Sequence, residues 1–180
     1  MKAFRITILG LVALALVLIV VGLLLPSSGS VSRSIVIKAP PEEIFAYVAN
    51  FKKGWGQWSD FDYEDPEIKY SYSGPEEGVG ASRTWISKKM GNGSQKIIKA
   101  DKRLGVEFEL AMQDTNFSIV GKFSFEPESS GTKVTWTDSW DSGYHLGFRY
   151  MALLMDKMMG PTFERSLSAL KEKAESQERK

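Results

Sequence analysis

The sequence lacks cysteine altogether and has one histidine, His145, among its 180 residues. The absence of cysteine excludes disulfides, thiolate nucleophiles and cysteine-based metal sites. One histidine cannot build an ordinary structural zinc site, and no G-x-S-x-G motif supplies it with a nucleophile. The sequence therefore predicts no metal site, no cofactor and no assigned catalytic residue, and His145 is interpreted as a loop residue.

The chain also lacks an excess of charge of one sign. It has 23 basic and 22 acidic residues, a formal net charge of +1, and no long basic run. Nucleic acid is therefore not an expected partner. The Gly91-Asn92-Gly93 stretch has neither the spacing nor the Lys-Ser/Thr ending of a phosphate-binding loop, and it is interpreted as a hairpin turn.

One long apolar run is present at the N-terminus. Ile6 to Leu25 contains no charged residue over 20 positions, which as a helix spans roughly 30 Å, the thickness of a bilayer's hydrocarbon core. Residues 1–25 are therefore predicted to be a single-pass transmembrane anchor, with membrane contact through residues 6–25. A cleaved signal peptide is the alternative, but the apolar run is longer than usual for one and ends without an A-x-A-like site.

Basic residues give the expected orientation of this anchor. Lys2 and Arg5 precede the apolar run, which favours a cytoplasmic N-terminus and an extracytoplasmic domain, periplasmic in a Gram-negative cell. Arg33 and Lys38 follow the run and oppose this orientation. The remaining chain is divided into a flexible linker at 26–32, one globular domain at 33–176 and a charged tail at 177–180.

The domain begins with a strand and a short helix. Residues 34–38 are rich in β-branched side chains, Pro40 and Pro41 suit the first turn of a helix, and an apolar stripe follows from Ile44 to Val48. Apolar and polar residues then alternate with a period of two, which predicts antiparallel strands with one apolar face. The expected strands are 68–72, 81–87, 94–100, 106–112, 117–125 and 133–140.

The C-terminal segment is expected to cover that apolar face as a long helix. Its apolar residues recur at helical spacing, and they are Leu153, Leu154, Met158, Phe163, Leu167 and Leu170. The resulting prediction is an α+β domain in which a curved antiparallel sheet packs on one long helix.

Four stretches in this order resemble the START-like (SRPBCC) superfamily, and in particular its polyketide cyclase/dehydrase-like members. They are IVIKAPPEEIFAYVANFKKGWGQWSDF, GVGASRTW, GTKVTWT and MGPTFERSLSALKEKAE, within about residues 31–175. The resemblance implies the helix-grip (Bet v 1-like) fold, in which the sheet curls around the C-terminal helix and leaves an apolar cavity. It does not specify a function, because members of the superfamily bind lipids, sterols, quinones and hormones, and only some are enzymes.

Aromatic and methionine side chains are dense on the segments that would face this cavity. A packed core is the alternative interpretation of the same residues. The candidate pocket residues are Trp58, Phe61, Tyr72, Arg83, Trp85, Phe108, Met112, Phe117, Trp136, Asp138, Trp140, Met155, Met158, Met159 and Phe163.

Two charged residues are expected to point into the cavity. Asp138 shares strand parity with Trp136 and Trp140, and Arg83 shares parity with Trp85. A buried carboxylate needs a partner or takes up a proton, so Arg83 is the candidate partner, and the pair could orient a polar group of an apolar ligand. A bulge that shifts the register would instead place either side chain in solvent.

These observations lead to three functional hypotheses. The first is a membrane-anchored binding protein for a hydrophobic small molecule such as a lipid, a quinone or a polyketide-like compound. The second is a polyketide cyclase/dehydrase-type enzyme that uses Asp138, Arg83, Tyr72 or Tyr144 as acid or base. The third is an envelope chaperone or interaction domain. A uniformly apolar cavity favours the first, a polar cluster the second, and a filled cavity the third.

Overall fold

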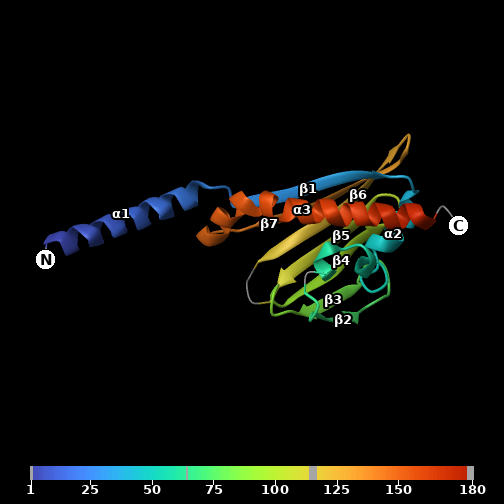
Figure 1. The fold of residues 1–180 in the computed structure, drawn as a ribbon, viewed down its shortest axis with the longest axis horizontal. Helices are drawn as coiled ribbons and strands as arrows, with labels where there is room; N and C mark the ends of the chain where they lie inside the picture. The colour runs from blue at the N-terminus through green and yellow to red at the C-terminus, as the bar shows by residue number, and fades with distance from the viewer. Residues whose placement is uncertain (1, 64, 114–116, 178–180) are drawn as a thin grey trace.

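The computed structural model describes residues 2–63, 65–113 and 117–177. Seven strands form one antiparallel sheet in the order β1-β7-β6-β5-β4-β3-β2. The long helix α3 lies across the sheet, and α1 extends away from the domain at the end where α3 begins (Figure 1). The bounds are α1 Lys2–Leu24, β1 Ser28–Ile37, α2 Pro41–Val48, η1 Trp55–Gln57, η2 Asp60–Tyr63, β2 Lys69–Ser73, β3 Ser82–Ile86, β4 Gly93–Asp101, β5 Gly105–Met112, β6 Ser118–Glu128, β7 Gly131–Asp141 and α3 Leu146–Gln177. The predicted helix-grip fold is confirmed.

Helix α2 forms as its sequence indicates. Pro41 occupies the first turn, where a missing N–H is tolerated, and Ile44 and Val48 are fully buried against the rest of the domain. After the helix, the Asn50 side chain accepts hydrogen bonds from the backbone N–H groups of Lys52 and Lys53. This turn directs the chain into η1 and η2 beneath the sheet.

The structure corrects the linker predicted at 26–32, because β1 already begins at Ser28. Its pairing with β7 runs from Ser28 opposite Asp141 to Ile37 opposite Thr132. Val31 is buried within this stretch, so these residues belong to the sheet. Serine and glycine have low strand propensity, and here the long neighbouring strand overrides it.

The apolar stripe predicted on the C-terminal helix is confirmed in its second half and corrected in its first. Phe163, Leu167 and Leu170 are fully buried against the sheet. Leu153 and Leu154 face outward instead, with 63% and 56% of their surface exposed. One turn is 3.6 residues, so the inward face that contains Phe163 continues through Met159, Met155 and Ala152.

Polar contacts also hold α3 to the sheet. Arg33 on β1 forms ion pairs with Asp156 and Glu164 of α3, at 2.8 and 2.7 Å. Gly160 lies directly against the Arg33 guanidinium, and a Cβ atom at this position would overlap it. A side chain at this position would require the Arg33 guanidinium to shift from its place against the helix.

Helix α1 is set apart from the domain by its composition. Its segment Ala3–Leu24 is long and apolar enough to cross a membrane, on the basis of length and composition. Almost all of its side chains are exposed, unlike those of a core helix.

Candidate functional site

The inward face of β7 forms the floor of the groove beneath α3. Val134, Trp136, Asp138 and Trp140 alternate with half-exposed neighbours and are all buried. The predicted parity is therefore confirmed, and no register shift places Asp138 in solvent. The strand runs along the whole groove. We call the end near Val134 and Trp136 the deep end, and Trp140 lies at the other end, next to α1.

Aromatic side chains fill the deep end of the groove. Trp136 stacks on Phe163 of α3 with ring centroids 4.0 Å apart, and Trp55 lies edge-on to Trp136 and to Phe108. Five of the candidate pocket residues pack with one another in this cluster, and they are Trp58, Phe61, Phe108, Trp136 and Phe163. This part of the groove is a packed core.

A pocket of about 320 Å³ lies at the other end of the groove, beside the first turns of α3. This volume is near the lower end for small-molecule sites, roughly 300–1,000 Å³. Its lining is almost wholly apolar, and Phe117 stacks on Phe148 across it with ring centroids 4.9 Å apart. The residues that line it are Gly91, Met112, Phe117, Trp140, Phe148, Met151, Ala152 and Met155.

Four of these residues, Met112, Phe117, Trp140 and Met155, are candidates from the sequence. The others on α3 are Phe148, Met151 and Ala152, which sequence reasoning did not select. With Met155 they follow the i, i+3, i+4, i+7 spacing of one helix face, so the pattern was present. Met158 and Met159 are also candidates from the sequence. Met159 is half-buried against the core, whereas Met158 is 58% exposed and faces away from it.

Asp138 lies on the groove floor next to Trp140 and away from solvent. Its carboxylate accepts a hydrogen bond of 2.9 Å from Trp136 Nε1, and it faces Gly121 of β6 and Val31 of β1 in the sheet register. Burial raises the pKa of the Asp138 carboxyl to about 7, and the hydrogen bond from Trp136 opposes that rise. Asp138 therefore exchanges a proton near neutral pH.

The structure corrects the predicted pairing of Asp138 with Arg83. Arg83 Nη1 contacts both carboxylate oxygens of Asp62, at 2.9 and 3.0 Å, and its Nε donates to Gln95. The guanidinium carbon also lies 4.8 Å from the ring of Trp55. Asp62 belongs to η2, which folds under β3, so the partner of Arg83 comes from this loop and not from β7.

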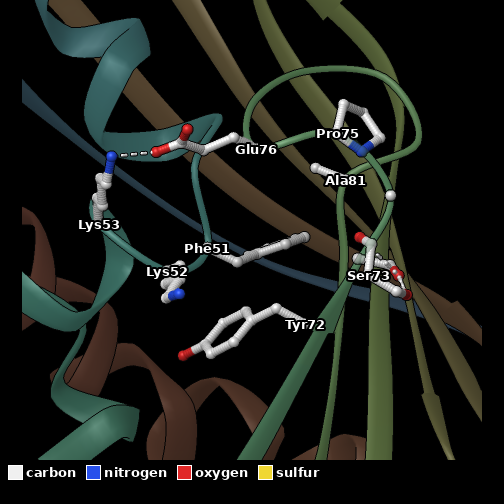
Figure 2. A pocket seen from close by; sticks show the side chains of 10 residues that line it. Phe51, Lys52, Lys53, Tyr72, Ser73, Pro75, Glu76 and Ala81 are labelled. Atoms are coloured by element: carbon white, nitrogen blue, oxygen red, sulfur yellow. Dashed lines mark hydrogen bonds and ion pairs between the residues drawn. The ribbon is translucent and has the colours of Figure 1, made fainter.

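The remaining two candidates lie on β2 and β3, away from the apolar pocket. Trp85 covers Gly93 on the neighbouring strand. Tyr72 is 41% exposed on the edge strand β2. It lines a separate surface hollow of about 350 Å³ with Phe51 and Lys52 (Figure 2), where a Lys53–Glu76 ion pair closes one side.

Within the described residues, no three histidine, cysteine, aspartate or glutamate side chains gather closely enough to hold a metal ion. His145 is exposed beside the start of α3, with its ring 5.8 Å from that of Phe148. Tyr144 is 87% exposed. Neither residue is among those that line the apolar pocket.

A family model described as "Polyketide cyclase / dehydrase and lipid transport" matches residues 28–175. The chain belongs to this family. Its matched range begins at the first residue of β1, in agreement with the corrected domain boundary. No curated protein matches the chain.

Solved structures resemble this family member in fold. Protein CV1439 from Chromobacterium violaceum is 12% identical, with a TM-score of 0.59 over 82% of this chain and 97% of that one. The di-domain ARO/CYC BexL from the BE-7585A biosynthetic pathway is 11% identical, with a TM-score of 0.57 over 83% and 50%. Ara h 8.0201 is 12% identical, with a TM-score of 0.51 over 83% and 99%. At these identities the likeness concerns the fold alone.

Proposed function

We propose that the protein is a membrane-anchored binding protein for a hydrophobic small molecule, which it holds between the sheet and the first turns of α3. The observation that carries this proposal is the pocket beside Phe117, Trp140 and Phe148, whose lining is almost wholly apolar. Apolar surface that lines a concave site favours an apolar ligand. Methionines at 112, 151 and 155 add adaptable side chains, which suit ligands of varied shape.

Retention of α1 as an anchor is supported by its contacts with α3. Arg149 is buried, and its Nη1 donates hydrogen bonds of 2.9 Å to the carbonyl oxygens of Leu23 and Leu25. Leu23 is in the last turn of α1 and Leu25 directly follows the helix, where no intrahelical donor remains for these carbonyls. Cleavage after residue 25 would remove these acceptors and leave a buried guanidinium without them. A cleaved signal peptide would not be expected to make such contacts.

The proposed orientation places the N-terminus in the cytoplasm. Lys2 and Arg5 lie on that side of the apolar run, in accordance with the positive-inside rule. The domain would then be extracytoplasmic, and periplasmic in a Gram-negative cell. The anchor keeps the pocket close to the bilayer, where apolar molecules are concentrated.

A polyketide cyclase/dehydrase-type enzyme is the second candidate, and Asp138 is the residue that favours it. Its buried carboxyl has a pKa of about 7, which suits a general acid or base at neutral pH. Arg83 is occupied by Asp62, and Tyr72 lines a different hollow. Asp138 shares its strand face with Trp140, which lines the apolar pocket.

Native mass spectrometry of the full chain, extracted from its own membrane, tests the binding function. The wild-type protein should carry a co-purifying apolar molecule. Ala152→Trp fills the pocket from α3 and should abolish that adduct. The matched control is Ala111→Trp, at an exposed position on the outer face of β5, which should keep it. Absence of any apolar adduct from the wild type, or its persistence in Ala152→Trp, would contradict the proposal.

A further inference from the structure

The first turns of α3 pack along the last turns of α1. The hydroxyl of Tyr150 donates a hydrogen bond of 2.5 Å to the carbonyl oxygen of Leu18. A Cβ atom on Gly22 would lie 3.0 Å from the Tyr150 ring and 3.2 Å from the side chain of Leu146. Together with the bonds from Arg149, these contacts fix the start of α3 beside α1.

These contacts place the start of α3 at a definite depth along the apolar helix. Leu18 precedes the last residue of α1, Leu24, by six positions, which is roughly 9 Å along a helix axis. A bilayer core of about 30 Å requires nearly the whole apolar run of α1 to span it. The Tyr150 hydroxyl therefore lies roughly 9 Å inside the boundary of the hydrocarbon core, among the outer segments of the acyl chains.

The outer face of the same turns is apolar and exposed. Leu153 and Leu154 are 63% and 56% exposed, and Met158, one turn further on, is 58% exposed. Three exposed apolar side chains within two turns of one helix are an apolar patch, and exposed apolar patches mark interaction sites. Lys157, also exposed, can extend its ammonium group to the headgroups from such a position. Tyr150, which contacts Leu18 of α1, lies on the same helix face one turn before Leu153 and Leu154, so the lipid around α1 is the surface that would cover the patch.

We propose that residues 146–158 of α3 form a second membrane contact, in which Leu153 and Leu154 lie in the lipid interface beside α1. Phe148 and Met151 are on the same turns and line the pocket from the opposite face of the helix, so this contact would hold the pocket close to the bilayer. An apolar ligand would then have a short path from the membrane to the pocket. This inference rests on the proposed spanning role of α1.

Site-directed fluorescence tests this contact. Because the chain has no native cysteine, a single introduced cysteine is the one site that a thiol-reactive fluorophore labels. The full chain is reconstituted in vesicles of phosphatidylcholine and phosphatidylglycerol, with an environment-sensitive fluorophore on Leu153→Cys or Leu154→Cys. Val12→Cys on α1 is the control for spanning, and Glu172→Cys on the exposed far half of α3 is the control for water. Quenching is measured with aqueous iodide and with lipids that carry a nitroxide close to the headgroup.

Labels at 153 and 154 should be quenched by the nitroxide lipids, and their iodide quenching should be several-fold weaker than at 172. If they are as accessible to iodide as 172 while the label at 12 is buried in lipid, the second contact is wrong and the anchor stands. If both quenchers fail at 153 and 154, a protein surface covers the patch, which also overturns the proposal. Iodide access at 12 would overturn the anchor itself.

Discussion

Trp136 and Asp138 are joined by a hydrogen bond of 2.9 Å on the groove floor, from the indole Nε1 to the carboxylate. Both side chains are buried, and this bond is the one polar contact that Asp138 accepts within the described part of the chain. A single neutral donor does not compensate for the loss of hydration, so burial raises the pKa of Asp138 to about 7. The carboxyl is therefore neutral in acid and becomes a buried charge above neutrality.

Asp138→Asn should consequently change how stability depends on pH. The folded state holds the Asp138 proton more tightly than the unfolded chain, whose ordinary pKa is 3.8. Wild-type stability should therefore fall as the pH rises from about 4 through about 7, by at most roughly 4 kcal/mol from this group. The amide of the variant carries no titrating proton, so this decline should be absent from it. Thermal unfolding of the full chain in detergent, followed by tryptophan fluorescence from pH 4 to 8, measures the difference.

Asp101→Asn is the control for this experiment. Hydrogen bonds from the backbone N–H groups of Arg103 and Leu104 lower the pKa of the Asp101 carboxyl, so its stabilising effect is lost only as the pH falls. That variant should leave the profile between pH 5 and 8 unchanged. A parallel decline in wild type and Asp138→Asn would contradict the assignment to Asp138.

Arg83→Gln tests the corrected ion pair. The side chains of Arg83 and Asp62 are only 5% and 8% exposed, so the substitution leaves a buried carboxylate without its counter-charge. We expect a loss of about 3–5 kcal/mol in the free energy of unfolding. The pH dependence assigned to Asp138 should be retained, because no hydrogen bond joins it to Arg83.

The surface ion pair Lys53–Glu76 is the matched control for Arg83→Gln. Its side chains are 71% and 59% exposed, so Lys53→Gln should change the free energy of unfolding little. Denaturant unfolding of both variants compares the two pairs. Similar small losses in both would show that the Arg83–Asp62 pair is not a structural requirement.

Gly121→Ala tests how tightly the deep end of the groove is packed. A Cβ atom at Gly121 would overlap the ring of Phe108, and that ring is already packed edge-on against Trp55. We expect a loss of about 1–3 kcal/mol from overpacking. Gly56→Ala, at an exposed position with no neighbouring atom within 4 Å, should change stability little.

A double variant separates overpacking from other effects of Gly121→Ala. Phe108→Leu removes the ring edge that the new methyl group meets, so its combination with Gly121→Ala should cost less than the sum of the two single changes. Additive losses would show that Phe108 does not limit the space at Gly121.

The fold follows from the sequence to the extent that local pattern decides it. Alternation of apolar and polar residues places β5 and β7 to within one or two residues, and the prolines before Ile44 place α2. The start of β1 could not be predicted, because Ser28 and Gly29 form a strand only through pairing with β7. Local propensity carries no information about such a partner.

The pocket was harder to predict than the fold because the core and the pocket are lined by the same residue types, aromatic residues and methionine. Trp136 and Trp140 share one strand face, yet Trp136 is covered by Phe163 and Trp140 lines the open end. Only the three-dimensional packing of α3 separates them. The partner of Arg83 is Asp62, which lies in a loop. The position of a loop cannot be predicted from the periodicity of apolar residues, so neither could this ion pair.

Arg149→Gln tests whether the junction between α1 and the domain is held by this one side chain. The guanidinium bonds the carbonyl oxygens of Leu23 and Leu25 and, through Nε, that of Gly143. Glutamine is shorter and cannot reach all three. Because hydrogen bonds from a charged donor contribute about 1.5–3 kcal/mol each, local opening of the junction should become at least roughly tenfold more frequent.

Hydrogen exchange of the full chain in nanodiscs measures this opening. The backbone N–H of Ser142 donates to the carbonyl oxygen of Ser27 at 2.7 Å, so its exchange reports directly on the junction and should accelerate in Arg149→Gln. Arg103→Gln removes an exposed ion pair with Glu42 at 3.3 Å and should leave Ser142 unchanged. Unaltered protection at Ser142 in Arg149→Gln would mean that packing of Tyr150 and Leu146 against Gly22 suffices to hold α3 on α1.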